Sequence, residues 1–259
     1  MQSFTVSAGD TALITGATAG IGLEFAHQLA SRGNHLVLVA RNADRLQTIS
    51  DELQQAFGIN VEVMIADLSK RNDCDAVAKR AGQSDIHLVV NNAGFGLNQS
   101  FIEDPVEAEQ ALLDVLVTAV MRISHAALPG MKHRNQGGVI NVSSVAGWMT
   151  SGTYSAAKSW VTTFSESLGM QLRGSNVHVM ALCPGFTRTE FQDRAGMETS
   201  TIPNWMWLDA TKLVKKALAD FEAGKLVSVP GAQYKVLSFI AKYFPRPLVR
   251  SLSIKSRKR

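Results

Sequence analysis

The 259-residue chain predicts an α/β fold with a doubly wound parallel sheet. Short, nearly continuous apolar runs alternate with longer segments of helical periodicity along most of the chain. Apolar runs of this kind are typical of strands in a parallel sheet, which helices cover on both faces. The chain shows no internal repeat and no low-complexity linker. Residues 1–232 are therefore expected to form a single Rossmann domain of about seven parallel strands.

The expected elements follow this alternation along the chain. Strands are expected at residues 11–15, 35–40, 61–66, 86–91, 138–143, 177–183 and 226–229. Helices are expected between them, at residues 21–32, 43–57, 70–81, 105–130, 152–173 and 209–222. Crossovers should be right-handed, and doubly wound sheets bind ligands at the carboxyl edge of the strands. The long irregular stretch at about 186–208 is expected to be a loop over that site.

A glycine-rich turn joins the first expected strand to the first expected helix. Residues 11–22 read TALITGATAGIG, with glycines at Gly16, Gly20 and Gly22. Glycines here allow a tight turn and a close approach to a pyrophosphate, which the helix N-terminus stabilises. Because the cluster follows a strand and opens a strand–helix–strand unit, it indicates a dinucleotide site more strongly than an ordinary turn.

Tyr154 and Lys158 are four residues apart in the stretch GTYSAAKSW. Positions i and i+4 share one face of a helix. A nearby ammonium favours the phenolate, so we expect Lys158 to lower the pKa of Tyr154. The serine pair Ser143 and Ser144 lies shortly upstream and can hold an oxygen that gains or loses the proton. These groups are suited to protonating a carbonyl oxygen while hydride reaches its carbon.

Together these segments resemble the short-chain dehydrogenase/reductase family over about residues 10–232. Six motifs occur in the family's order: TGATAGIG at 15–22, ADL at 66–68, NNAG at 91–94, NVSS at 141–144, YSAAK at 154–158 and PGFTRT at 184–189. The resemblance implies that Tyr154 is the general acid in reduction and the base in oxidation. It also implies that Lys158 lowers the Tyr154 pKa and binds the nicotinamide ribose, and that Ser144 positions the carbonyl oxygen. Ser143 is the alternative to Ser144, because the serine–tyrosine gap is short.

The resemblance also assigns the contacts with a dinucleotide. The expected cofactor-binding residues are Gly16, Thr18, Gly20, Ile21, Gly22, Arg41, Asp67, Leu68, Asn92, Ala93, Gly94, Tyr154, Lys158, Pro184, Gly185 and Thr187. Asp67 is expected to contact the adenine amino group, to cap the following helix, or to do both. Asn91 is expected to stabilise the central sheet. No metal site is expected.

The end of the second expected strand favours NADP(H) over NAD. NAD-binding units usually place an acid there, which bonds the ribose 2′-hydroxyl. Here the strand ends in Ala40 and Arg41, and no carboxylate follows before Asp44. A guanidinium suits a 2′-phosphate, which it can grip with paired hydrogen bonds. The alternative is that Arg41 is an ordinary charge beside a helix; Arg45 could add a second contact or face solvent.

One position departs from the family pattern. The family usually has an asparagine on the preceding helix, which anchors a water that carries protons to the lysine. Counting back from LPGM at 128–131 places this position at Leu116, which can neither donate nor accept a hydrogen bond. Either the alignment slips or the relay runs differently, and a lost relay could cost up to about 10²–10⁴ in rate. The alternative function is therefore a nucleotide-binding sensor or interaction module with little turnover.

Apolar side chains are concentrated in the irregular stretch at 186–208. They are Phe186, Phe191, Met197, Trp205, Met206 and Trp207, and Trp148 and Met149 are expected to line the same space. Aromatic and methionine side chains on a mobile loop form an apolar, adaptable lid. We expect a small apolar carbonyl or alcohol substrate, such as a fatty-acyl, steroid-like or aromatic compound. The alternative is that the loop packs on its own core.

Charge is distributed unevenly along the chain. The net charge is +4, but residues 233–259 contain eight Lys or Arg and no Asp or Glu. Apolar residues recur there at helical spacing, namely Val236, Leu237, Phe239, Ile240, Tyr243 and Phe244. A basic amphipathic C-terminal extension can make peripheral contact with an anionic membrane. The alternative is that it packs on the enzyme or on a partner subunit, and no nucleic-acid partner is expected because the body lacks a basic groove.

The sequence also bears on compartment and assembly. No signal peptide or transmembrane helix is apparent, and Cys74 and Cys183 have no metal-ligand spacing. A reducing compartment is the simplest interpretation, so we expect a cytoplasmic location, with membrane association as the alternative if the extension contacts a bilayer. Cys183 is expected to pack as a small apolar side chain. The family resemblance implies a homodimer or homotetramer packed through the helices at 105–130 and 152–173.

Overall fold

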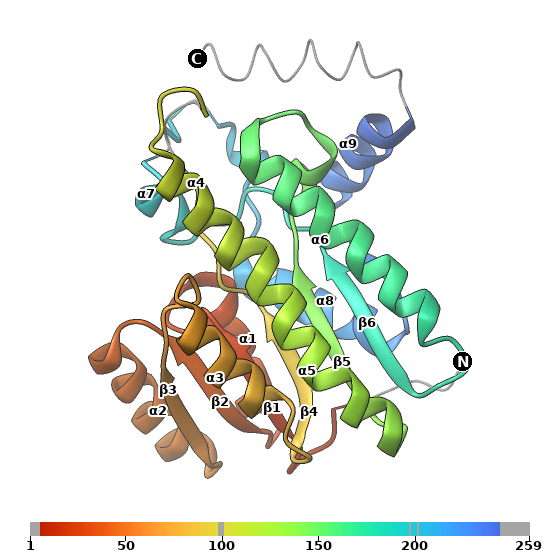
Figure 1. Ribbon diagram of the computed structural model, residues 1–259. Coiled ribbons are helices and arrows are strands. Elements are labelled where there is room, and N and C mark those ends of the chain that lie inside the picture. Colours follow the sequence, from red (N-terminus) through yellow and green to blue (C-terminus); the bar gives the residue numbers. More distant parts are fainter. Residues whose placement is uncertain (1–5, 98–100, 197, 201, 244–259) are drawn as a thin grey trace.

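Seven parallel strands form one sheet with helices on both faces in the computed structural model of the chain (Figure 1). The structure describes residues 6–97, 101–196, 198–200 and 202–243. The strand order is β3-β2-β1-β4-β5-β6-β7, so the winding reverses between β1 and β4. This is the doubly wound topology, in which ligands bind at the carboxyl edge near the reversal. The predicted fold class is confirmed.

The expected strands and most expected helices form within a few residues of their predicted bounds. The strands are β1 Thr11–Thr15, β2 His35–Ala40, β3 Val61–Ile65, β4 Ile86–Asn91, β5 Gly137–Val142, β6 Val177–Leu182 and β7 Val227–Ser228. The corresponding helices are α1 Gly20–Ala30, α2 Ala43–Phe57, α3 Arg71–Ala81, α6 Gly152–Gln171 and α8 Ala210–Glu222. A further helix, α9 Ala232–Tyr243, begins the basic extension, as its apolar spacing suggested.

Several elements differ from the expectation. The helix expected at 105–130 consists of α4 Val106–Leu113, a π-helical turn η1 Asp114–Thr118, and α5 Ala119–Arg134. The stretch at 186–208 is not entirely irregular, since it contains α7 Phe191–Arg194 and the 3-10 turn η3 Asn204–Met206. A second 3-10 turn, η2 Val145–Trp148, follows β5. Such short turns carry too few residues for a periodic signal.

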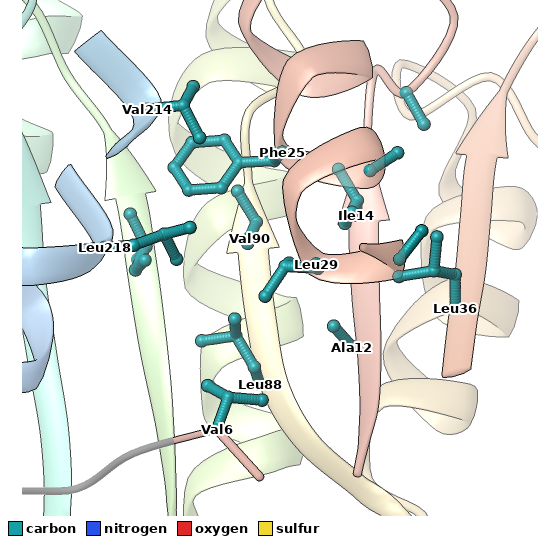
Figure 2. Packing of buried hydrophobic residues seen from close by; sticks show 14 of the residues in the cluster. Val6, Ala12, Ile14, Phe25, Leu29, Leu36, Leu88, Val90, Val214 and Leu218 are labelled. Atoms are coloured by element: carbon teal, nitrogen blue, oxygen red, sulfur yellow. The ribbon is translucent and has the colours of Figure 1, made fainter. Parts of the chain in front are cut away.

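Two apolar cores lie on opposite faces of the sheet. Successive strand side chains alternate between them, so Ile14 faces α1, α2 and α8 whereas Leu13 faces α3 and α5. Figure 2 shows part of the first core, in which the Phe25 ring of α1 lies beside Val214 of α8 and Leu29 lies near Val90 of β4. Each fully buried side chain of this size stabilises the fold by about 1.5–3 kcal/mol. The cores fix the strand ends from which the site is built.

A buried polar network connects the centre of the sheet with two helices. Asn91 Nδ2 of β4 donates to Asn141 Oδ1 of β5 at 2.8 Å and to Ser124 Oγ of α5 at 3.2 Å. Asn141 Nδ2 in turn donates to Ser165 Oγ of α6 at 2.9 Å. All four side chains are buried, so these bonds replace the lost contacts with water. The geometry agrees with the structural role expected for Asn91.

The segment Val106–Arg134 meets the length and hydropathy criteria for a membrane-crossing helix, which the sequence analysis did not anticipate. Its inner residues Val115, Ile123 and Met131 belong to the second apolar core. In Figure 1 the segment runs along the sheet beside α3 and α6. A core helix with this burial satisfies the same criteria, so they carry little weight here.

Candidate active site

Tyr154 and Lys158 project from the first turns of α6, beside the carboxyl end of β5. Lys158 is buried, and its Nζ donates to the carbonyl oxygen of Val142 at 2.7 Å. The same Nζ lies 5.7 Å from the centre of the Tyr154 ring. Ser144 lies two residues after β5, and its hydroxyl is close enough to the Tyr154 phenol to lower the pKa of that group. The three side chains expected to carry catalysis are therefore neighbours.

The two serines of the pair have different partners. Ser144 Oγ accepts from the backbone N–H of Ala146 at 3.1 Å and donates to the Pro184 carbonyl at 3.4 Å. Ser143 Oγ donates to the Lys158 carbonyl at 2.6 Å and lies 2.7 Å from Thr162 Oγ1. Ser143 is buried between β5 and α6. This geometry favours Ser144 over Ser143 as the serine that meets a substrate.

Burial shifts the two titrating groups in opposite directions. It raises the pKa of the Tyr154 phenol to about 12, although the hydrogen bond with Ser144 opposes the rise. It lowers the pKa of the Lys158 ammonium to about 8. Burial is the largest influence on the Tyr154 pKa in the polypeptide alone, and the expectation that Lys158 lowers this pKa stays a prediction. Tyr154 is thus protonated throughout the neutral range and available as an acid.

Leu116 occupies the position next to the lysine. It lies in the middle of η1 and is buried. A Cβ built on Gly94 would lie 2.9 Å from Leu116 Cδ2 and 3.9 Å from Lys158 Nζ, so these three residues are neighbours. Leu116 packs with Leu112 and Ala157, and the Tyr154 ring borders this cluster. An apolar side chain therefore lies beside Lys158, and the π-helical turn presents it there.

The turn between β1 and α1 packs closely against the end of β4. Gly16 has φ +66° and Gly20 has φ +54°, the left-handed region that favours glycine. A Cβ on Gly22 would lie 2.3 Å from the Gly16 carbonyl oxygen and 2.4 Å from Asn92 Nδ2. Asn92 Nδ2 donates to the carbonyl oxygens of Thr15 at 2.9 Å and Gly16 at 3.1 Å. The glycine positions thus allow the strand ends to meet, and Asn92 fixes the turn.

The N-terminus of α1 fits the pyrophosphate of a dinucleotide. Ala19 is the N-cap and provides no side-chain hydrogen bond, and the first turn carries no acidic side chain. Such a terminus presents unpaired N–H donors and the positive end of the helix dipole to an anion. Thr18 is buried in the preceding turn, and Ile21 packs partly against the first core.

The two arginines after β2 have different surroundings. Arg41 is exposed at the strand end, near the carboxylate of Asp67. Arg45 forms paired hydrogen bonds with Glu190, at 3.0 and 2.5 Å between nitrogen and oxygen. This pair joins α2 to the 186–208 stretch, a role that differs from both expectations for Arg45. Of the two guanidinium groups, the exposed one is Arg41.

Asp67 closes a turn after β3. Its Oδ1 accepts from the N–H of Ser69 at 3.0 Å and from Ser69 Oγ at 2.7 Å. The expected helix-capping role is wrong, because α3 begins only at Arg71 with Lys70 at its N-cap. Burial raises the pKa of this carboxyl, but the Ser69 hydrogen bonds and the Arg41 charge outweigh it and lower the pKa below the ordinary value. The adjacent Leu68 is buried.

A tyrosine from α9 holds the loop that follows β6. Tyr234 is buried, and its hydroxyl accepts from the Phe186 N–H at 2.9 Å and donates to the Met206 carbonyl at 2.7 Å. A Cβ on Gly185 would lie 2.0–2.3 Å from carbon atoms of the Tyr234 ring. Sequence reasoning missed this residue, since the contact joins positions 48 residues apart. Only glycine at position 185 leaves room for the ring.

Aromatic side chains of the 186–208 stretch reach Tyr154. The ring centres of Phe191 and Tyr154 are 6.0 Å apart, and those of Phe186 and Trp207 are 5.8 Å apart. Thr187 is buried and donates to the Gly185 carbonyl at 3.0 Å. Trp148 and Met149 are partly buried, and Met197 lies outside the described residues. Tyr154 therefore borders apolar side chains from two sides of the site.

Comparisons with known proteins agree on one family. A family model described as short chain dehydrogenase matches residues 10–199. The chain is similar to a very-long-chain 3-oxoacyl-CoA reductase of Laccaria bicolor, with 36% identity over 186 residues. This match covers 69% of the chain but only 55% of the relative, so the chain spans about half the length of that protein.

Solved structures share the fold across nearly the whole chain. A short-chain dehydrogenase from Sphingobium yanoikuyae in complex with NADPH superposes with a TM-score of 0.83 at 32% identity, covering 90% of this chain and 94% of that chain. A short chain dehydrogenase/reductase from Burkholderia phymatum in complex with NAD superposes with a TM-score of 0.82 at 25% identity, covering 95% and 97%. The neighbours thus include complexes with either nicotinamide dinucleotide.

Proposed function

The chain belongs to the short-chain dehydrogenase/reductase family, and we propose that it is an NADP(H)-dependent enzyme that reduces an apolar ketone or aldehyde, or oxidises the matching alcohol. The observation that carries this proposal is that Tyr154, the Ser144 hydroxyl and the buried ammonium of Lys158 lie close together. A binding module needs none of these groups in this arrangement. An oxidoreductase needs all three.

Each side chain has a distinct part in the proposed reduction. A bound nicotinamide in its reduced form would supply hydride to the carbonyl carbon. Tyr154 donates its phenolic proton to the carbonyl oxygen, and the Ser144 hydroxyl holds that oxygen. The Lys158 ammonium stabilises the tyrosinate that remains until solvent returns a proton. The products are the alcohol and the oxidised nicotinamide, and oxidation runs the same steps in reverse.

The choice of NADP(H) rests on Arg41. The strand end carries this exposed guanidinium and no carboxylate, which suits the additional phosphate of NADP(H). Asp67 lies near Arg41 and stays ionised, so it is suited to the adenine amino group. The Sphingobium neighbour, which contains NADPH, supports the choice, whereas the Burkholderia neighbour contains NAD.

The substrate is proposed to be apolar because the surroundings of Tyr154 are apolar. Phe191 approaches it from the 186–208 stretch, and the cluster of Leu112, Leu116 and Ala157 borders its ring. The similar protein from Laccaria bicolor is named for a long-chain 3-oxoacyl substrate. A fatty-acyl, steroid-like or aromatic carbonyl compound fits these surroundings. The expected homodimer or homotetramer and the cytoplasmic location stay predictions.

The test is NADPH oxidation by the purified chain against a matched panel of carbonyl compounds. The panel contains a long-chain 3-oxoacyl thioester, a ketosteroid, an aryl ketone and, as the polar control, a keto sugar. We expect turnover with apolar members at rates well above the control. Turnover of the keto sugar alone would contradict the apolar-substrate proposal.

Leu116 supports a second candidate, a nucleotide-binding sensor or interaction module with little turnover. An apolar residue beside Lys158 removes the polar group through which the family's proton relay is expected to run. The same panel distinguishes the oxidoreductase from the binding module if NADPH binding is also measured, through the fluorescence of NADPH. Binding without turnover of any compound would favour the module.

A further inference from the structure

Helix α9 leaves most of its apolar residues exposed to solvent. Val236, Leu237, Phe239 and Tyr243 are exposed, and Tyr234 is the buried residue that attaches the helix. Trp205 is 62% exposed, and its backbone lies near the start of α9, since Gln233 Nε2 donates to the Trp205 carbonyl at 3.2 Å. We call these five exposed residues, Val236, Leu237, Phe239, Tyr243 and Trp205, the α9 face. Helix α9 thus packs on the enzyme through Tyr234, whereas these five residues remain exposed.

The charged residues of α9 are all basic. The helix itself carries Lys235 and Lys242 and no acidic residue. The sequence continues to position 259 with six more Lys or Arg and no Asp or Glu. Apolar side chains together with clustered cations are the composition of a helix that lies in a lipid–water interface. Tryptophan and tyrosine are also the residues enriched at that interface.

A second copy of the chain is a poor match for the same surface. If the faces of two copies met, their Lys235 and Lys242 ammonium groups would be brought together. Like charges brought together oppose association unless acidic groups separate them. Residues 232–259 offer no such acidic group. The charge therefore favours an anionic surface as the occupant.

We propose that the α9 face docks on an anionic lipid bilayer, with its aromatic and aliphatic side chains in the interface and its lysines at the lipid headgroups. In Figure 1, α9 lies at the same end of the molecule as α7 and the start of α6. Tyr234 connects this helix to the loop at Phe186 and Met206. Docking brings that loop to the bilayer surface, so substrates dissolved in lipid reach it directly. Only this last consequence rests on the proposed function.

The test measures sedimentation of the full chain with phosphatidylcholine vesicles that contain phosphatidylserine. We expect binding that increases with the phosphatidylserine fraction and weakens with salt. The double variant Val236→Gln with Phe239→Gln should bind at least about tenfold more weakly, since both side chains leave the interface. The matched control is Met170→Gln, an exposed apolar residue on α6, which should bind like the wild type. Turnover of a water-soluble ketone should be unchanged in both variants.

Two results would overturn the proposal. The first is equal vesicle binding by the double variant and the wild type. The second is a fall in molar mass of the double variant in light scattering, which would assign the α9 face to a second copy. Tryptophan fluorescence gives a check that needs no α9 variant: vesicles should shift the emission of the wild type to the blue, and Trp205→Phe should lose that shift. Because vesicle binding is measured without a substrate, its failure leaves the proposed reaction untouched.

Discussion

Burial sets the charge states of Tyr154 and Lys158 more strongly than their proximity does. The phenol has a pKa of about 12 and the ammonium of about 8, each shifted toward its neutral form. For Lys158 the folded value lies below the ordinary value of 10.5, so burial of its charge costs stability below about pH 8. This cost is relieved as the pH rises from 8 towards 10.5. The site thus keeps a charge that opposes folding, as functional sites often do.

The Lys158 pKa predicts the pH at which kcat/KM for reduction begins to fall on the alkaline side. Tyr154 stays protonated to about pH 12, so the group that changes first is Lys158, whose cation is lost as the pH rises through about 8. We expect kcat/KM for reduction to be level below pH 8 and to fall about tenfold per pH unit above it. Lys158→Arg should remove this fall, because a guanidinium keeps its charge. A wild-type kcat/KM that stays level until about pH 10 and falls only above it would contradict this account.

Arg41→Asp tests the cofactor preference at a single residue. Removing a guanidinium from a phosphate loses about 1.5–3 kcal/mol, which corresponds to about 10–100-fold in affinity. We expect the dissociation constant of NADPH to rise by this factor in fluorescence titrations while that of NADH changes little. Arg45→Gln serves as the control, since that arginine is already paired with Glu190. Equal losses for NADPH and NADH in Arg41→Asp would refute the preference.

Two elements of the site arise from contacts that no local pattern reveals. The π-helical turn η1 places Leu116 beside Lys158, yet its sequence reads as part of one continuous helix. Helix α9 holds the loop after β6 through Tyr234, across 48 residues of chain. By contrast, the strands and longer helices follow from apolar periodicity, which is a local property. Sequence reasoning therefore located Tyr154, Lys158 and Ser144 but missed the supports around them.

Leu116→Asn tests whether a polar group beside Lys158 limits turnover. Asparagine would allow a water to be held there, so we expect kcat for reduction to rise about tenfold, within the range of a positioned proton-transfer group. The free energy of unfolding should fall by about 2–4 kcal/mol, since a buried leucine is lost. Leu116→Ala is the control, with a similar loss of stability and no gain in kcat. If both variants keep the wild-type kcat, proton supply does not limit the reaction.

Tyr234→Phe tests the attachment of α9 to the loop. The change leaves the Phe186 N–H and the Met206 carbonyl without their partner. We expect the free energy of unfolding in urea to fall by about 1–3 kcal/mol, and KM for an apolar ketone to rise as the loop loosens. Tyr243→Phe on the same helix is the control, because that side chain is exposed. Similar results for the two variants would remove the role assigned to Tyr234.

At the scale of the whole molecule, the sheet brings distant motifs to one edge. The winding reverses between β1 and β4, so the glycine turn after β1 meets Asn92 and Ala93 after β4. The alternation of elements and the preference for right-handed crossovers predicted a doubly wound parallel sheet, although they did not give the order of its strands. The pair between Arg45 and Glu190, 145 residues apart, did not, because it depends on how the 186–208 stretch folds back over α2. Global topology was thus predictable, whereas the contacts of this stretch were not.

The central claim is that Tyr154 hands its proton to a carbonyl oxygen beside a bound nicotinamide, and Tyr154→Phe tests it most directly. The measurement compares turnover of the best apolar ketone with NADPH affinity, in this variant and in the wild type. We predict that the dissociation constant for NADPH stays within about twofold, while turnover falls by about 10²–10⁴ because the acid is lost. A variant that binds NADPH normally and keeps more than about a tenth of the wild-type rate would contradict the claim.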